Sequence, residues 1–249
     1  MNIIEIENLS HRFSDGKFGI QDINLTIPKG EFLVIGGQNG SGKTTLLKHL
    51  NGLLLPTTGT IKISGVEVSS HIKQARQMVG MVFQNADSQI VGETVYDDVA
   101  FGPENLCLGR QIIANRVFLA LKAVGLTQHA DKRPHLLSGG EKRRLSIAGI
   151  LAMEPKIIVF DEPFSSLDYP GIRQVLKQII SLHQSDHTII ITTHDVEKII
   201  AHANRLLIMQ DGKVKRDGTP DMILKEAEAF GVRAPCATRL GAEVASWLS

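Results

Sequence analysis

GQNGSGKT, at Gly37–Thr44, matches the phosphate-loop pattern G-x-x-x-x-G-K-[ST] between an apolar run, Phe32–Ile35, and a helical stretch, Thr45–Leu50. In such a loop the glycines let backbone N–H groups face the α- and β-phosphates at the N-terminus of a helix. The lysine reaches the β- and γ-phosphates, and the hydroxyl after it can ligate Mg²⁺. We therefore expect a purine nucleoside triphosphate to be bound by Gly37, Gln38, Asn39, Gly40, Ser41, Gly42, Lys43, Thr44 and Thr45.

Short apolar runs elsewhere predict a parallel sheet around this loop, and so an α/β fold. Phe32–Ile35, Ile157–Phe160 and Thr188–Ile191 have the composition of buried parallel strands. Ligands of α/β proteins bind at the carboxyl ends of such strands. Other runs, including a hairpin with a tight turn, predict further strands at Ile3–Leu9, Ile23–Ile27, Thr60–Ser64, Met78–Phe83, Arg205–Gln210 and Lys213–Arg216.

The middle of the chain has a helical pattern. It extends from residue 93 to about residue 132 and is clearest at Arg110–Val124. Farther on, the sequence LSGGE at Leu137–Glu141 contains an S-x-x-E capping box, formed by Ser138 and Glu141. This box predicts the start of a second helix, which we expect to run to about Met153.

Two adjacent carboxylates follow a predicted strand in IIVFDEP, at Ile157–Pro163. The strand delivers Asp161 to its carboxyl end, where a carboxylate can hold Mg²⁺ through water. Glu162 points differently and is suited to polarise an attacking water. The alternative is an ordinary acidic pair between a strand and a turn.

The phosphate loop and LSGGE together make the chain resemble the ATP-binding-cassette (ABC) family over nearly its whole length. The resemblance implies an α/β fold, a P-loop NTPase core of ABC nucleotide-binding-domain type with an antiparallel β subdomain and a helical subdomain at about residues 85–153. It implies ATP and Mg²⁺ as ligands and ATP hydrolysis as the activity. It also identifies IIVFDEP as the Walker B element, with Asp161 and Thr44 at the metal.

The same resemblance assigns roles to four further positions. His194, after TIIITT, matches the switch histidine that contacts the γ-phosphate and the water, so Glu162 and His194 are the expected catalytic pair. Gln84, at the end of MVGMVFQ, matches the glutamine that senses Mg²⁺ and the γ-phosphate. Asp168, in SSLD, lies in the D-loop that joins two active sites across a dimer. Phe13 takes the place of an aromatic residue that stacks on adenine, usually Tyr; the alternative for Phe13 is a core residue.

The signature motif departs from the family at one position. The resemblance implies that Ser138, Gly139 and Gly140 face the γ-phosphate bound by the other protomer. Most relatives have Gln where this chain has Glu141. Either residue completes the capping box. The helix N-terminus carries about half a positive charge, which an extra carboxylate nearby would weaken. We expect Glu141 to turn back onto the cap.

One branch of the family matches best. After Gln84 the chain reads NADSQIVGETVYDDVAFGPENL, which resembles the energy-coupling-factor (ECF) importers of cobalt, nickel and vitamins, with Ala86 in place of the usual proline. The tail FGVRAPCATRL, Phe230–Leu240, resembles theirs too. The resemblance implies an ABC ATPase domain at residues 1–227 and a short C-terminal dimerisation segment at 228–249. It also implies that Asn85–Leu106 forms a groove for a short helix of a membrane scaffold.

The implied protein is the ATPase subunit of an ECF importer of a metal ion (cobalt or nickel) or a vitamin. Its implied partners are an integral membrane scaffold subunit, a substrate-binding membrane subunit, and a second ATPase in a homodimer or a heterodimer with a paralogue. Two rivals remain: a soluble ABC ATPase of iron–sulfur cluster assembly, whose signatures also run S-G-G-E-K, and the ATPase of a conventional ABC importer.

The resemblance implies a peripheral position on the cytoplasmic face of the cell membrane, and bulk composition indicates a soluble, cytoplasmic protein. The net charge is +1, which gives no support for nucleic-acid binding, and the two cysteines imply no disulfide framework. No apolar run approaches the roughly 18 residues that a membrane span needs. His183 and His187 stand four apart but have no evident third ligand, which favours structure over a metal. Glu197 and Lys198 are assigned to a solvated helix.

Overall fold

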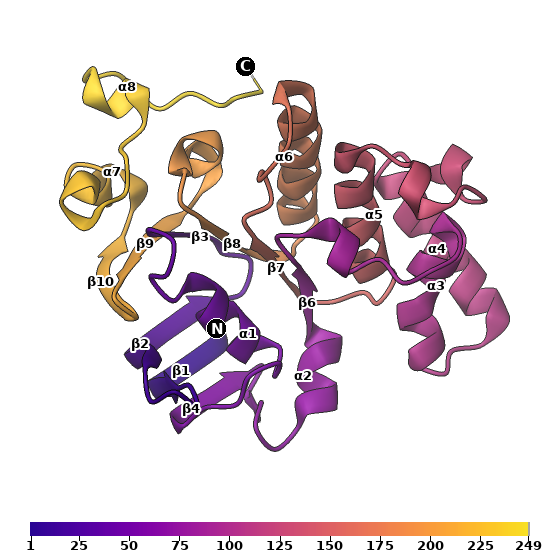
Figure 1. Cartoon of the computed structure of the whole chain (residues 1–249), viewed down its shortest axis with the longest axis horizontal. Coiled ribbons are helices and arrows are strands. Elements are labelled where there is room, and N and C mark those ends of the chain that lie inside the picture. The colour runs from indigo at the N-terminus through magenta and orange to yellow at the C-terminus, as the bar shows by residue number, and fades with distance from the viewer. Residues whose placement is uncertain (249) are drawn as a thin grey trace.

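The computed structural model describes residues 1–248, and the fold is built on two β-sheets (Figure 1). The larger sheet has six strands in the order β10-β9-β3-β8-β7-β6. Its pairs from β9 to β6 are parallel, and β10 joins one edge antiparallel to β9. These strands are β3 (Phe32–Gly36), β6 (Val79–Val82), β7 (Ile157–Asp161), β8 (Thr188–Thr193), β9 (Arg205–Gln210) and β10 (Lys213–Gly218).

The parallel strands are buried on both faces. On β3, Phe32 and Val34 belong to one hydrophobic core, whereas Leu33 and Ile35 belong to another. Successive side chains of a strand point to opposite faces of its sheet, so each apolar run supplies both cores. That is why these strands read as continuous apolar stretches without a polar alternation.

A second, antiparallel sheet covers one face of the first. Its order is β2-β1-β4-β5, from β1 (Asn2–Arg12), β2 (Phe18–Pro28), β4 (Thr58–Ile63) and β5 (Val66–Glu67). The helix α1 (Lys43–Leu50) contributes Leu46, Leu47 and Leu50 to the core between the sheets. A shorter helix, α2 (Ile72–Met78), leads into β6.

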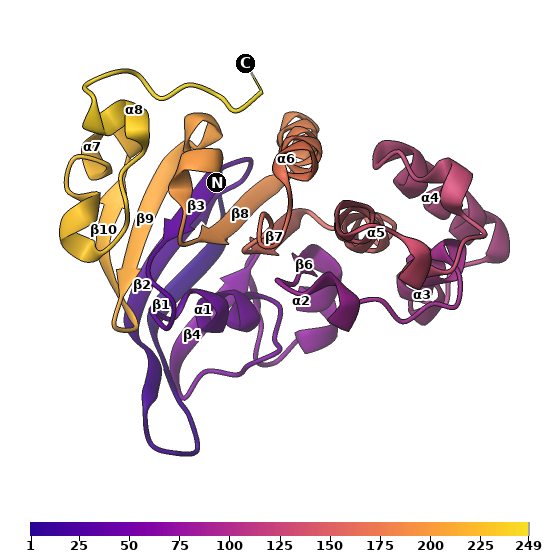
Figure 2. The same ribbon diagram turned by 45° about the horizontal axis from the view of Figure 1, so that its top comes forward.

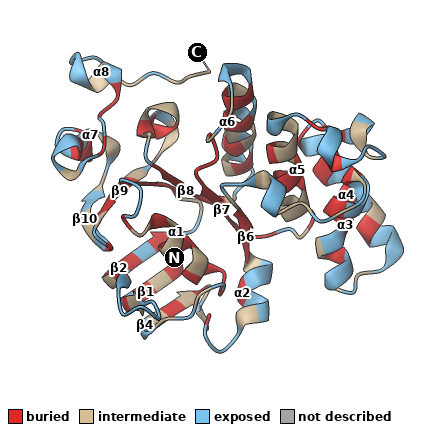
Figure 3. Cartoon of the chain, in the orientation of Figure 1, coloured by how far each residue is buried: buried red, intermediate tan, exposed pale blue. Residues whose placement is uncertain are grey.

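The other face of the larger sheet is covered by α6 (Tyr169–Gln184), whose buried side lies toward the strands (Figure 3). Three more helices pack on one another to the side of the sheet (Figures 1 and 2): α3 (Val95–Asn105), α4 (Arg110–Ala123) and α5 (Gly139–Leu151). They occupy the stretch for which the sequence analysis expects a helical subdomain. α3 also begins with a capping box, formed by Thr94 and Asp97.

The chain ends in short elements beside β9 and β10. They are α7 (Pro220–Ile223), the 3₁₀ turn η6 (Ala227–Phe230) and α8 (Cys236–Arg239). Beyond α8 the chain runs back toward α6 (Figure 2). Within residues 1–248 no helix combines the length and the apolar character that crossing a membrane requires.

The predicted α/β fold with a buried parallel sheet is confirmed, and each predicted strand overlaps an observed one. The bounds agree within about two residues except that β1 ends three residues later and β2 starts five residues earlier than predicted. The sequence analysis makes no prediction for α2, α7, α8 or β5, and α5 ends two residues before the predicted end. Its assignment of Glu197 and Lys198 to a helix is wrong. They lie in the 3₁₀ turn η4 (Val196–Lys198), because the Asp195 side chain accepts a bond from Glu197 N at 3.3 Å and closes a tight turn.

Candidate functional site

Gly37–Gly42 connects β3 to α1, and close backbone approach requires glycine at two of its positions. Gly42 has a φ of +100°, and a Cβ there would lie 2.7 Å from the carbonyl oxygen of Gly19. At Gly37 a Cβ would lie 2.5 Å from the carbonyl oxygen of Met209. The loop packs so tightly against the backbones of β2 and β9 that these two positions leave no room for a side chain.

Lys43 is buried at the start of α1, only 6% exposed. Its Nζ donates to the carbonyl oxygens of Gly37 at 2.7 Å and Gln38 at 3.0 Å, and lies 3.8 Å from Glu162 Oε1. Burial lowers the pKa of Lys43, while the carboxylates of Glu162 and Asp161 oppose that shift. The loop's own carbonyls thus hold the ammonium group in place, close to the carboxylates.

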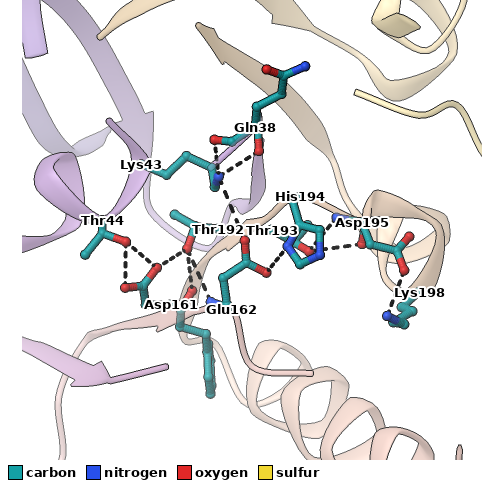
Figure 4. A network of polar contacts seen from close by, with 12 residues as sticks. Gln38, Lys43, Thr44, Asp161, Glu162, Thr192, Thr193, His194, Asp195 and Lys198 are labelled. Carbon is teal, nitrogen blue, oxygen red and sulfur yellow. Dashed lines mark hydrogen bonds and ion pairs between the residues drawn. The ribbon is translucent and has the colours of Figure 1, made fainter. Parts of the chain in front are cut away.

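Asp161 ends β7, and its carboxylate links this strand to α1 and β8 (Figure 4). The Thr44 hydroxyl donates to both of its oxygens, at 3.0 and 2.8 Å. The Thr192 hydroxyl, from the end of β8, donates to Oδ1 at 2.6 Å. The structure therefore brings together Thr44 and Asp161, which the sequence analysis assigns to the metal. It adds Thr192, which that analysis missed although TIIITT carries the signal of a polar residue at a strand's end.

Glu162 lies one residue beyond β7 in an unusual backbone conformation, with a φ of +48°. Its N–H donates to the carbonyl oxygen of Thr192 at 3.1 Å, which turns its side chain away from that of Asp161. Its Oε2 bonds His194 Nδ1 at 3.0 Å, and its Oε1 is buried without a hydrogen-bond partner in the described chain (Figure 4). Backbone strain of this kind in a non-glycine residue concentrates at functional sites.

A cavity of about 490 Å³ opens over the phosphate loop. It is lined by Asn39–Thr45, Gln84 and Glu162, and Phe13 forms part of its wall. Phe13 is 43% exposed, so it is not the core residue that the alternative reading of the sequence allows. Phe18, which the sequence analysis did not single out, lines the same wall and has no local motif that marks it.

A larger cavity, of about 700 Å³, lies on the far side of Gln84 and Glu162. These two residues line both cavities, and His194 lines the larger one. Gln84, Glu162 and His194, which the resemblance assigns to the γ-phosphate, lie together along the larger cavity. The structure thus gathers the residues predicted to act on that phosphate, from three different elements.

The signature helix α5 is capped as predicted. Ser138 Oγ accepts from Glu141 N at 3.3 Å, and Glu141 Oε2 accepts from Ser138 N at 2.7 Å. Glu141 does turn back onto the cap, and its other oxygen bonds His129 Nε2 at 3.1 Å. The hydrogen bonds from Ser138, backbone first, lower the pKa of Glu141 to about 2. The extra carboxylate is therefore occupied by its own helix terminus.

Some predicted site residues lie apart from the phosphate loop within one chain. Ser138, Gly139, Gly140 and Asp168 do not line the cavity above the loop, although Gly139 lines the larger cavity together with Gln84, Glu162 and His194. Asp168 caps α6 instead, accepting from Gly171 N at 2.9 Å. Such a placement is what sharing of the sites between two protomers would require.

The two histidines weighed as a metal pair bond the backbone. His183 Nε2 contacts the carbonyl oxygen of Gly30 at 2.9 Å, and His187 Nδ1 contacts that of Leu182 at 3.1 Å. Each of these hydrogen bonds links a histidine side chain to the backbone of a neighbouring segment.

The residues present fit a nucleotide triphosphate with Mg²⁺. Hydroxyl and carboxylate oxygens, from Thr44 and Asp161, are the hard ligands that Mg²⁺ takes. The loop has no room for a Cβ at Gly37 or Gly42, and Ser41 Oγ and Glu162 Oε1 are buried without hydrogen-bond partners among residues 1–248. The arrangement can bind phosphate oxygens and orient a water beside a carboxylate and an imidazole.

Comparison with known proteins agrees with this geometry. The sequence profile of the ABC transporter family matches residues 20–165. The energy-coupling factor transporter ATP-binding protein EcfA1 of Caldanaerobacter subterraneus subsp. tengcongensis is 46% identical over 248 residues, which cover 96% of this chain and 89% of the relative. EcfA of Methanocaldococcus jannaschii is 44% identical over 92% of this chain and 84% of its own length.

The fold also matches a solved structure. The protein cbiO1 from Clostridium perfringens, described as part of the ABC transporter complex cbiONQ, superposes with a TM-score of 0.83 at 37% identity. The match covers 92% of each chain. Family membership and site geometry agree that the chain is an ATPase.

Proposed function

Since this chain belongs to the ABC transporter family of ATPases, we propose that it is the ATP-hydrolysing subunit of an ECF-type membrane importer. One observation carries the proposal: similarity to an ECF ATP-binding protein extends over 96% of the chain, beyond the residues 20–165 that the ABC family profile matches. We infer that it lies peripherally on the cytoplasmic face of the membrane. Its cargo is a metal ion, cobalt or nickel, or a vitamin.

Hydrolysis is assigned to the end of β7. Mg²⁺, held by Thr44, Asp161 and Gln84, would offset the charge of the β- and γ-phosphates. Lys43 pairs with the same phosphates. Glu162 accepts a proton from the attacking water, and His194, bonded to Glu162 Oε2 at 3.0 Å, orients that water and contacts the γ-phosphate.

Two ATPase chains complete each site, as a homodimer or a heterodimer with a paralogue. The signature residues Ser138–Gly140 and the D-loop Asp168 act on the nucleotide of the opposite protomer. The C-terminal segment, residues 228–249, is assigned to dimerisation. Its described end lies beside the D-loop helix: the Trp247 ring centroid is 5.8 Å from that of Tyr169, and Arg173 Nη2 donates to the Leu248 carbonyl at 3.2 Å.

Docking to an integral membrane scaffold subunit, which joins a substrate-binding membrane subunit, is assigned to Asn85–Leu106. Within this segment Ile90 packs against the core, whereas Val91 is 61% exposed. The Asp98 carboxylate accepts from Val91 N at 2.7 Å and Gly92 N at 3.0 Å, which fixes the turn that presents Val91. Val91 is therefore the better probe of docking, because changing Ile90 would also disturb packing.

The test is co-purification from solubilised membranes, comparing wild type with Val91→Glu. We expect wild type to retain an integral scaffold and Val91→Glu to lose it, with ATP binding by the isolated subunit unchanged. The matched control is Met222→Glu on α7, 68% exposed and outside the segment. Recovery of cluster-assembly proteins or a conventional permease would contradict the proposal. Uptake of labelled cobalt, nickel and vitamins by cells carrying each variant would identify the cargo.

A further inference from the structure

Arg143 is a cation buried in an unusual place. It lies on the signature helix α5, two residues after Glu141 of the capping box, and is only 3% exposed. Its Nε has no hydrogen-bond partner among residues 1–248. Burial lowers the pKa of Arg143, and the negative charge of the Asp161 carboxylate opposes that shift. A buried charge without a paired opposite charge costs stability, so its retention needs a reason beyond packing.

The guanidinium holds the loop that contains Gln84. Nη1 donates to the carbonyl oxygen of Phe83 and Nη2 to that of Gln84, the latter at 2.5 Å. These two carbonyls lie just beyond β6, where the chain leaves the sheet for the helical side. A planar fork of donors holds two neighbouring carbonyls in a fixed relative orientation, whereas the ammonium group of a lysine, on a flexible stem, does not fix that orientation.

Other contacts make the same loop rigid. Gln89 folds back on the strand, donating from Nε2 to Met81 O at 3.0 Å and accepting from Phe83 N at 3.0 Å. Lys142, the neighbour of Arg143 on α5, pairs with Asp87 at 2.7 Å. The loop from Phe83 to Gln89 is thereby closed onto β6 on one side and fastened to α5 on the other.

We propose that Arg143 is a positioning residue that couples the nucleotide bound in its own chain to the signature helix. By binding the backbone of Gln84, it makes any displacement of Gln84 at the γ-phosphate displace the start of α5. The signature residues at that start then change position toward the opposite protomer's site. This proposal rests on the proposed function, which places the γ-phosphate at Gln84. The competing explanation is a cross-link that only adds stability.

Hydrogen exchange with and without ATP tests the coupling in the full chain carrying Glu162→Gln, so that the nucleotide stays intact. The variants are Arg143→Met, which keeps the length without donors, and Arg143→Lys, which keeps the charge without the fork. The matched control is Arg144→Met, the next residue on α5, whose guanidinium bonds the Gln174 side chain. The same substitutions in the otherwise unchanged chain give KM and kcat, and thermal unfolding monitors the fold.

We expect ATP to protect both residues 37–50 and residues 138–145 in the Glu162→Gln chain and in the Arg144 control. With Arg143→Met and Arg143→Lys, ATP should still protect 37–50 but no longer 138–145. Their kcat should fall about tenfold with KM within a factor of about two to three, the effect of one lost charge-assisted contact.

Two results would overturn the proposal. If ATP still protected both regions in Arg143→Met and kcat were normal, Arg143 would be a cross-link that only adds stability. Loss of protection in both regions, with a lower melting temperature, would assign it a general structural role. A wild-type chain that binds ATP without hydrolysing it would contradict the proposed function instead, while the exchange comparison would still decide the coupling.

Discussion

At the scale of single residues, the Glu162 carboxylate serves two neighbours with its two oxygens. Oε2 bonds His194, and Oε1 lies 3.8 Å from Lys43 Nζ without a hydrogen bond among residues 1–248. An oxygen that is buried and unpartnered is costly unless a ligand uses it. The geometry therefore separates an oxygen that orients the imidazole from one that is left for a water.

Glu162→Gln should bind ATP with near wild-type affinity but hydrolyse it at least about a hundredfold more slowly, since a positioned general base contributes at least that much. The amide keeps the size of the side chain and the contact with His194, but it cannot take the proton. Single-turnover hydrolysis and a nucleotide-binding titration check the two halves of this expectation. Single-turnover hydrolysis near the wild-type rate would refute the role of Glu162.

Glu141 offers a second prediction at this scale, in the pH dependence of stability. Its pKa is about 2 in the folded chain against 4.5 for the free residue, because Ser138 hydrogen-bonds the charged form. A lowered pKa contributes stability above pH 4.5 that is lost as the pH falls from 4.5 toward 2. Since the side chain is 26% exposed, we expect this contribution to be only about 1 kcal/mol.

Glu141→Gln keeps the capping box but removes the charge, so it should lower the free energy of unfolding by about 1 kcal/mol at pH 7. The difference from wild type should shrink as the pH falls from 4.5 toward 2. Urea unfolding at a series of pH values measures it. A difference that stays constant with pH would show that the charged form of Glu141 is not preferentially stabilised.

At the scale of elements, the local sequence predicts the strands and helices that depend on burial and on local hydrogen bonds. β3, β7 and β8 are apolar runs because both of their faces are buried, and the capping box at Ser138 determines where α5 starts. The same rules could not predict Arg143, whose backbone partners lie about sixty residues earlier in the chain. They indicate Thr192 only as a polar residue at a strand's end, and they could not predict its bond to Asp161, because the two become neighbours only once β7 pairs with β8.

The loop after β6 gives a prediction about an element. Ala86, the first residue of the 3₁₀ turn η1 (Ala86–Ser88), replaces the proline usual in ECF relatives. Its predecessor Asn85 is extended, with φ −98° and ψ 107°, which is the conformation that a following proline requires. The first position of a helical turn also tolerates the loss of an N–H.

Ala86→Pro should therefore raise the free energy of unfolding by about 0.4–1 kcal/mol, because proline restricts the unfolded chain more than the folded one. The Asn85 side chain, which accepts from Asp87 N at 3.0 Å, should keep the turn in place. Urea unfolding measures the change, with Ala86→Gly as the contrasting variant expected to lose stability. If Ala86→Pro lowered the free energy of unfolding instead, this would mean that the proline ring strains the turn.

At the scale of the whole molecule, the chain holds the phosphate loop and the signature motif on different bodies. Lys43 begins α1 beside the sheets, while Ser138 caps α5 among the helices at the side (Figure 1). A nucleotide over the phosphate loop would meet Gln84 and Glu162 from its own chain but not Ser138. If the sites are composite, each protomer contributes a different half to each of the two sites.

Complementation between two defective chains tests this arrangement directly. Lys43→Ala removes the ammonium group that pairs with the β- and γ-phosphates, and Ser138→Arg blocks the signature helix terminus, so each variant alone should be inactive. In a heterodimer of the two, one composite site has both halves wild type and the other has neither. An equal mixture should therefore recover up to about a quarter of wild-type ATPase activity, because half of randomly formed dimers are heterodimers with one intact site. Activity should be measured against protein concentration, with heterodimers verified by differently tagged chains. Verified heterodimers without ATPase activity would show that the signature of one protomer does not act on the nucleotide of the other.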